Sequence, residues 1–119
     1  MSEKENLLQE TLYKLGITRK LKSYEVMFSA VLKVIDNPDK LFGVTKDLYI
    51  DLAKSTNSSL TRIEKSLRGA TEKAWTYNPE YLKKITHLDL TKRPSSTEFI
   101  DMIAVYIERT SSETKKATN

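Results

Sequence analysis

The sequence predicts an all-α fold: a compact bundle of about six helices that contains a helix-turn-helix. Apolar residues recur at spacings of three and four along most of the chain, and no strand-like alternation interrupts them. With 119 residues the chain has the size of one domain. Only three Gly and three Pro occur, and five of these six lie between the periodic segments: Gly16, Pro38, Gly43, Pro79 and Pro94.

Two helices are predicted in the first third of the chain. The first covers about residues 4–15 and ends at Gly16, a residue that suits the left-handed position after a helix. Its apolar face consists of Leu8, Leu12 and Leu15. The second covers residues 23–35, and Asn37-Pro38 stops it. Its apolar positions are Tyr24, Met27, Phe28, Val31, Leu32 and Ile35.

The central pair of helices is separated by a short Ser/Asn turn. After a turn at 41–43, Thr45 can cap a third helix that ends near Thr56. Its buried face is predicted to be Leu48, Tyr49, Leu52 and Ala53. Ser58 or Ser59 can then cap a fourth helix that continues to Trp75. Its apolar stripe is predicted to be Leu60, Ile63, Leu67, Ala70 and Ala74.

Two further helices complete the predicted bundle. Asn78-Pro79 opens a short one, with Tyr81, Leu82 and Ile85 apolar. Residues 95–98, Ser-Ser-Thr-Glu, form a capping-box pattern before the last helix, in which the Ser and Glu side chains each satisfy the other's backbone amide. That helix has its apolar positions at Phe99, Met102, Ile103, Tyr106 and Ile107. We expect one domain over residues 1–109 and a flexible tail over 110–119.

Composition excludes several functions. The chain has no Cys and one His, His87, so it has no Cys/His cluster that could bind a metal. We expect a surface or capping role for His87. No catalytic or phosphate-loop motif occurs, so we expect no enzyme activity, no cofactor and no small-molecule substrate. Residues 1–6 are charged and lead into short apolar runs, which predicts neither a signal peptide nor a membrane span. A reducing, cytoplasmic setting fits best.

The basic charge points to an anionic partner. The net charge is +4, and residues 40–73 contribute seven basic and four acidic side chains, or +3. Two short helices with this turn are spaced as in a helix-turn-helix, whose second helix enters the DNA major groove. Helical geometry places Thr61, Lys65, Arg68, Gly69 and Glu72 opposite the apolar stripe of the fourth helix, with Arg62 and Glu64 on its flanks. An ordinary solvated face with an Arg68–Glu72 pair is the alternative.

Donors and acceptors on this face match base edges. Arg and Lys donate to guanine, and Glu accepts from cytosine. We expect base contacts from Arg62, Glu64, Lys65, Arg68 and Gly69. Arg62 lies on the flank of the helix, and this position is also suitable for a phosphate contact. We expect phosphate contacts from Lys46, Lys54, Ser58, Ser59, Thr61 and Lys73. The predicted partner is double-stranded DNA, and no membrane partner is expected.

Three stretches resemble the C-terminal effector domain of the stage-zero sporulation protein A family: VTKDLYIDLAK (44–54), NSSLTRIEKSLRGATEKAW (57–75) and RPSSTEFI (93–100). The similarity covers about residues 15–108. It implies a six-helix bundle that binds a short DNA element as a transcription regulator. The resemblance carries base recognition to Arg62, Glu64 and Arg68, and to Lys65, where the family tends to have Arg.

The sequence departs from the family at several positions. Gly69 stands where the family tends to have His, Ile50 where it has Pro, and the 75–99 connection is shorter. A Gly inside a helix costs about 1 kcal/mol relative to Ala. Gly69 is therefore either tolerated or needed for close approach of DNA.

The family's usual receiver domain is not present in these 119 residues, since nothing here alternates strands and helices. The chain is either a fragment or a stand-alone effector domain, which would bind DNA without phosphate control. The resemblance also implies self-association on DNA. The alternative function is a helical protein-interaction module that uses Tyr106 and Ile107 to bind a partner, or that competes with a related full-length regulator.

Overall fold

The computed structural model describes residues 1–41 and 45–118, with side chains described outside 41–46 and 113–119. Within these residues there are six α-helices and one 3-10 turn, and no strand. In chain order they are α1 (Glu3–Lys14), α2 (Tyr24–Asp36), η1 (Pro38–Leu41), α3 (Thr45–Thr56), α4 (Leu60–Tyr77), α5 (Pro79–Thr86) and α6 (Ser96–Thr118). The all-α prediction is confirmed.

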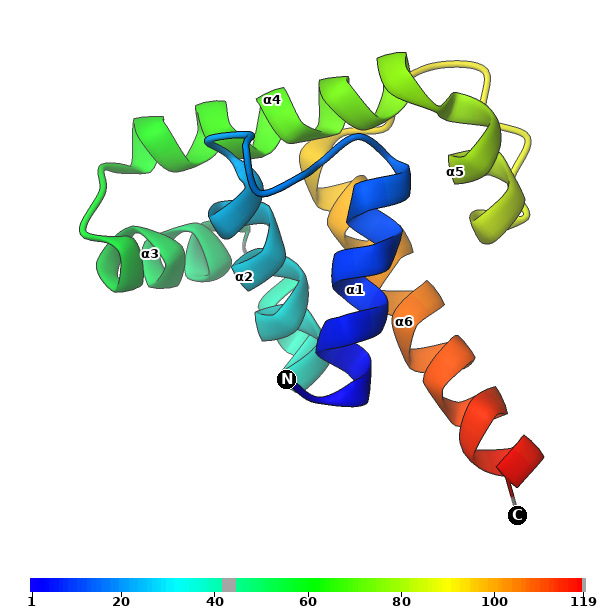
Figure 1. Cartoon of the computed structure of the whole chain (residues 1–119). Helices are drawn as coiled ribbons and strands as arrows, with labels where there is room; N and C mark the ends of the chain where they lie inside the picture. The colour runs from blue at the N-terminus through cyan, green and yellow to red at the C-terminus, as the bar shows by residue number, and fades with distance from the viewer. Residues whose placement is uncertain (42–44, 119) are drawn as a thin grey trace.

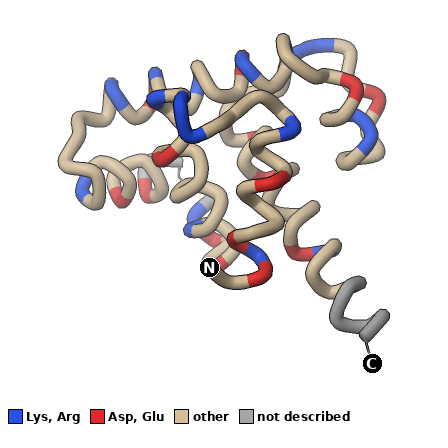
Figure 2. Tube along the Cα trace, viewed as in Figure 1, with Lys and Arg blue, Asp and Glu red and all other residues tan. Residues whose placement is uncertain are grey.

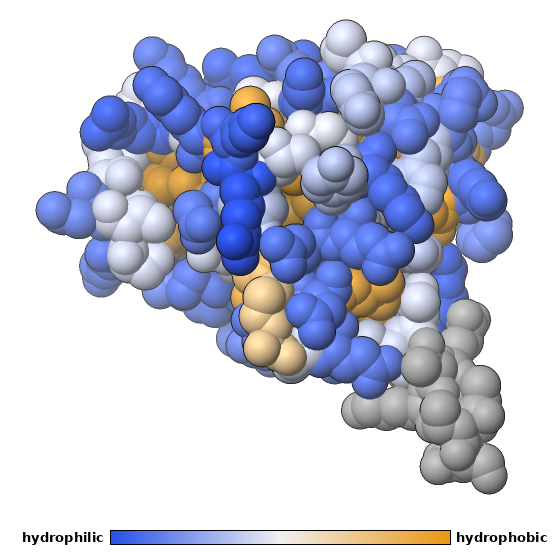
Figure 3. All heavy atoms as spheres, viewed as in Figure 1, coloured by the Kyte–Doolittle hydropathy of each residue, from blue (hydrophilic) through white to orange (hydrophobic). Residues whose placement is uncertain are grey.

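The helices pack around one apolar core. α6 packs against α1 and α2, and α4 lies across the bundle in contact with α2, α3, α5 and α6 (Figure 1). The largest fully buried side chains include Leu8, Met27, Leu52, Leu67, Leu82 and Phe99, one from each of the six α-helices. Hydrophilic side chains cover most of the face shown in Figure 3, with small apolar areas between them. This packing holds α4 at one side of the molecule, with its polar face outward.

Local signals in the sequence account for most helix ends. The predicted capping box forms, because Ser95 Oγ accepts the Glu98 N–H (3.2 Å) and Glu98 Oε1 accepts the Ser95 N–H (2.8 Å). The Asn78 side chain accepts the Tyr81 N–H (3.2 Å) at the start of α5. Ser2 forms a second capping box with Glu5 at the start of α1, which sequence reasoning did not single out.

Gly16, which follows α1, packs against Tyr77 at the end of α4. Its φ of +82° is the left-handed conformation that the sequence predicts there. A Cβ at this position would lie 2.7 Å from Cγ of Tyr77, so the Tyr77 ring occupies the space that a side chain would need. The Asn78 amide also donates to the Lys14 carbonyl (3.2 Å). The left-handed turn and the close ring therefore both require glycine.

Two expectations about the helices are wrong. Leu60 belongs to the predicted apolar stripe of α4 but is 45% exposed, because it is the first residue of the helix and lies beyond the packed face. The sequence predicts a flexible tail over 110–119, whereas α6 continues to Thr118. No Gly or Pro follows Pro94 to stop it, and Ser111 still packs against the body of the protein at 2% exposure.

Part of the segment between η1 and α3 lies outside the described residues. The predicted turn at 41–43 overlaps residues 42–44, and the predicted cap by Thr45 depends on a side chain that is not described. α3 begins at Thr45 and ends at Thr56, as the sequence predicts. Leu48 and Leu52 are fully buried, and Tyr49 and Ala53 are half-buried.

Candidate nucleic-acid interface

A three-residue turn, 57–59, fixes how α4 leaves α3. Asn57 adopts a left-handed conformation (φ 53°), and the Ser58 N–H donates to the Ala53 carbonyl (2.9 Å). Ser59 Oγ accepts the Arg62 N–H (3.2 Å), so Ser59 is the cap where the sequence left Ser58 or Ser59 open. α3 and α4 pack against each other. This arrangement of two packed helices with a tight turn is consistent with a helix-turn-helix.

α4 separates apolar and polar side chains cleanly. Ile63, Leu67, Ala70 and Ala74 face the core and are at most 1% exposed. We define the α4 outer face as the exposed residues Thr61, Arg62, Glu64, Lys65, Arg68 and Gly69. All five predicted base-contacting residues belong to it. From Arg62 to Gly69 the helix rises roughly 10 Å, about three base-pair steps of DNA.

The cations of the α4 outer face have no carboxylate partner. Among the described residues, no Asp or Glu oxygen lies within 4.0 Å of the charged groups of Arg62, Lys65 or Arg68. The Arg68–Glu72 pair of the alternative interpretation does not form, because Glu72 pairs with Arg93 (2.7 Å). The donors of Arg68 are thus available to a ligand. Figure 2 shows Lys and Arg positions along the length of α4.

Tyr49 of α3 lies next to this face. Burial raises the pKa of its hydroxyl, the negative charge of Glu64 raises it further, and Arg68 opposes both. The phenol is therefore close to both charged side chains and stays neutral at physiological pH. The sequence placed Tyr49 only on the buried side of α3, and its neighbours on α4 are set by the packing of the two helices.

The predicted phosphate-contacting residues fall into two groups. Lys54, Ser58, Ser59 and Thr61 lie at or near the turn that begins α4, and all but the half-buried Ser58 are exposed. Lys73 is twelve residues beyond Thr61, roughly 18 Å along the helix, and its Nζ stands 5.5 Å from the centre of the Tyr77 ring. Lys46 lies in the first turn of α3, but its side chain is outside the described part.

Gly69 has open space around it. A Cβ added there would meet no atom of the protein within 4 Å, and the residue is helical without a positive φ. Packing within this chain therefore does not require glycine at position 69, in contrast to Gly16. Tolerance and close approach of DNA both stay open.

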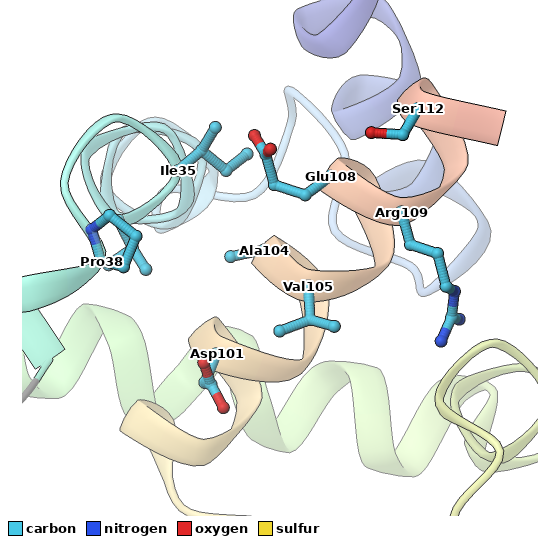
Figure 4. A pocket seen from close by; sticks show the side chains of 9 residues that line it. Ile35, Pro38, Asp101, Ala104, Val105, Glu108, Arg109 and Ser112 are labelled. Carbon is cyan, nitrogen blue, oxygen red and sulfur yellow. The ribbon is translucent and has the colours of Figure 1, made fainter. Parts of the chain in front are cut away.

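The residues proposed for a protein partner are less accessible than predicted. Ile107 is fully buried, so its assignment as a partner-binding residue is wrong. Tyr106 is half-buried beside Tyr81, whose pKa is raised to about 12, mainly by burial and then by Tyr106. Among the described side chains of α6, the large apolar one that is exposed is Val105, at 52%. It borders an open groove of about 400 Å³ between α6 and the end of α2, with Ile35, Pro38 and Ala104 (Figure 4).

Other residues with chemical potential have structural positions. His87 is exposed and forms the left-handed C-cap of α5 (φ 57°), which confirms its expected surface or capping role. Among the described residues no group of three or more His, Asp or Glu could hold a metal ion. In that same part of the chain, every helix is too short or too polar to cross a bilayer.

Comparison with known protein families matches most of the chain. The model described as "Sporulation initiation factor Spo0A C terminal" matches residues 8–107, which include α1 from Leu8, the α3–α4 pair and α6 as far as Ile107. The match covers most of the chain and supports a DNA-binding effector domain. It agrees with the resemblance seen in the three sequence stretches. This chain therefore belongs to the family of sporulation initiation factor Spo0A C-terminal domains.

Proposed function

We propose that this chain binds double-stranded DNA sequence-specifically and regulates transcription, with α4 in the major groove. The observation that carries the proposal is the α4 outer face, whose three cations have no carboxylate within 4.0 Å among the described residues. In water such cations cost the fold little, and on DNA they gain guanine or phosphate acceptors. A transcription regulator acts at the chromosome, and we therefore propose a cytoplasmic location for this protein.

Each polar residue has a proposed role. Lys65 and Arg68 donate to guanine O6 and N7, and Glu64 accepts from cytosine N4. Arg62 contacts either a base or a phosphate, and Gly69 lets the helix backbone approach the base pairs. Lys46, Lys54, Ser58, Ser59, Thr61 and Lys73 contact phosphates and set the position of α4 along the groove. Ser59 accepts a hydrogen bond as the helix cap, and its own hydroxyl proton is left for a phosphate oxygen.

The direct test is a titration of duplex DNA by fluorescence anisotropy. A duplex selected from a random pool should bind more tightly than a scrambled duplex. The affinity for both should fall by about an order of magnitude or more between low and physiological salt, because several phosphate contacts release counterions. The protein-interaction alternative, in which the chain binds a related full-length regulator, predicts no duplex binding and a partner affinity that hardly depends on salt.

We further propose that DNA binding by these residues needs no regulatory phosphate. A small phosphodonor should change neither the mass of the protein nor its affinity for the selected duplex. A stable aspartyl phosphate that tightened binding would contradict this.

A further inference from the structure

The densest positive charge of the chain lies outside the helix pair. Residues 11–24 contain Lys14, Arg19, Lys20 and Lys22 and no acidic residue, and three of these four fall within residues 19–22. We define the α1–α2 loop as residues 15–23. Its three cations, Arg19, Lys20 and Lys22, are exposed, and among the described residues none has a carboxylate within 4.0 Å.

This loop is held firmly although it has no helix. Leu15 and Ile17 are fully buried at its start, Ser23 is 8% exposed at its end, and Leu21 packs against the core between them. Two backbone bonds fold the segment between these anchors: Leu21 N–H to Thr18 O (2.9 Å) and Tyr24 N–H to Leu21 O (3.0 Å). Buried and half-buried residues thus anchor the backbone that carries the three exposed cations, and the Arg19 side chain also hydrogen-bonds Tyr24, so the segment is pre-organised.

The fold places this loop along α4. At one end, Gly16 fits against the Tyr77 ring at the end of α4, and at the other end the chain enters α2, which packs against α4. In Figure 1 the loop runs alongside α4 between these two points. In Figure 2 its Lys and Arg positions appear beside those of α4. The loop ends 38 residues before Thr61, the first residue of the α4 outer face, so only the tertiary structure places the loop along α4.

A helix in the major groove is bordered by sugar–phosphate backbone. The groove is about 12 Å wide, close to the 10–12 Å diameter of a helix with its side chains, so segments beside the helix meet phosphates on its flank. We propose that Arg19, Lys20 and Lys22 bind phosphates of the duplex that α4 reads, as a flanking electrostatic clamp. The proposal rests on the proposed function. It assigns the loop to backbone binding, which carries no sequence preference.

The test compares two variants with the same change in net charge. R19Q/K20Q/K22Q removes the loop cations. K4Q/K33Q/K84Q removes three cations elsewhere: Lys4 pairs with Glu108 and Lys33 with Asp51, both at the protein surface, and Lys84 is exposed on α5. Affinity for the selected and the scrambled duplex is measured by anisotropy from about 50 to 200 mM salt. Circular dichroism checks that both variants are folded, and K20Q/K22Q serves as a milder loop variant.

The expected result is a change in the salt dependence specific to the loop variant. The slope of log affinity against log salt is negative, and each lost phosphate contact makes it shallower by about 0.9. The triple variant should therefore have a slope shallower by roughly two to three units, and K20Q/K22Q by about two. Affinity for both duplexes should fall about equally, leaving their ratio unchanged. The control variant should keep the slope of the parent.

Three outcomes overturn the inference, and they are distinguishable. If the parent binds DNA and the loop variant keeps its slope, the loop does not bind phosphates, while the proposed function stands. If the loop variant loses discrimination between the two duplexes at an unchanged slope, the loop contacts bases instead. If the parent binds no duplex, the proposed function is wrong, and this inference is wrong as well.

Discussion

The charged side chains in the two halves of α4 have different surroundings. In the first half, residues 60–69, the cations of Arg62, Lys65 and Arg68 have no carboxylate within 4.0 Å among the described residues. In the second half, Glu72 pairs with Arg93, and Lys73 stands over the Tyr77 ring. The Tyr77 ring in turn fills the space beside Gly16. The second half is thus connected to α1 and to the segment before α6, and the first half leaves its charges to solvent.

This difference separates stability from binding. Exposed cations contribute little to folding, so their replacement should leave the protein intact, whereas the buried face and the connected half hold α4 in place. A helix that is fixed at one end and along its inner face presents the outer residues of its first half in a constant geometry. The following predictions test this division, from the largest expected effect to the smallest.

Leu67→Ala should cost about 2–5 kcal/mol of unfolding free energy, because the fully buried side chain leaves a cavity under the first half of α4. Urea denaturation followed by circular dichroism measures the loss. The neighbouring Arg68→Ala is the matched control and should change stability by less than about 0.5 kcal/mol. Equal losses in the two variants would mean that the inner and outer faces of α4 are not separate.

Arg68→Ala should weaken binding to a selected duplex by about 1–3 kcal/mol, roughly five- to a hundredfold, since a guanine edge loses its donors. Binding to a scrambled duplex should weaken far less. Lys65→Ala should behave in the same way. Anisotropy titrations at one fixed salt concentration measure both affinities. A folded Arg68→Ala protein that binds its selected site as tightly as the parent would show that α4 does not read the DNA.

Gly16→Ala should cost about 1–3 kcal/mol of unfolding free energy, because alanine is strained at φ +82° and its Cβ would lie 2.7 Å from the Tyr77 ring. Thermal unfolding of Gly16→Ala, Tyr77→Ala and the double variant separates the two causes. In the Tyr77→Ala background the Gly16 substitution should cost less, since the ring is removed and the backbone strain and the Cβ of residue 77, 3.0 Å away, are left. An equal cost in both backgrounds would argue against the contact between the ends of α1 and α4.

Gly69→Ala should stabilise the protein by about 0.5–1 kcal/mol, because alanine favours the helix and its Cβ meets open space. Thr76→Ala, at an exposed position in the second half, provides a control that raises helix propensity away from the outer face. If DNA approaches the backbone at Gly69, only the first substitution should weaken binding to the selected duplex. Unchanged affinity in both variants would identify Gly69 as merely tolerated.

Replacing the Glu72–Arg93 pair should have the smallest effect. Both side chains are nearly half exposed, so a double-mutant cycle with Glu72→Gln and Arg93→Gln should give a coupling energy of about 0.2–1 kcal/mol. The coupling should shrink as salt is added. A coupling that salt does not alter would mean that the pair is held by more than its charges.

Sequence alone determined the helices and the polarity of α4. The capping box at Ser95 and Glu98 and the Asn78 cap of α5 depend on residues three positions apart, and the apolar stripe of α4 depends on its own repeat. Such signals act within one or two turns of the chain. The exposure of the predicted base-contacting residues follows from the same repeat.

Only the tertiary structure decided which distant residues meet. Arg93 pairs with Glu72, 21 residues away in sequence, and Arg68 is left without that partner. The Tyr77 ring fills the space beside Gly16, and Tyr49 lies close to Glu64. Packing also left Leu60 exposed and fixed both ends of the α1–α2 loop against α4, through Gly16 at Tyr77 and through α2. No local pattern encodes these outcomes, because each depends on how separate helices bury their apolar faces against one another.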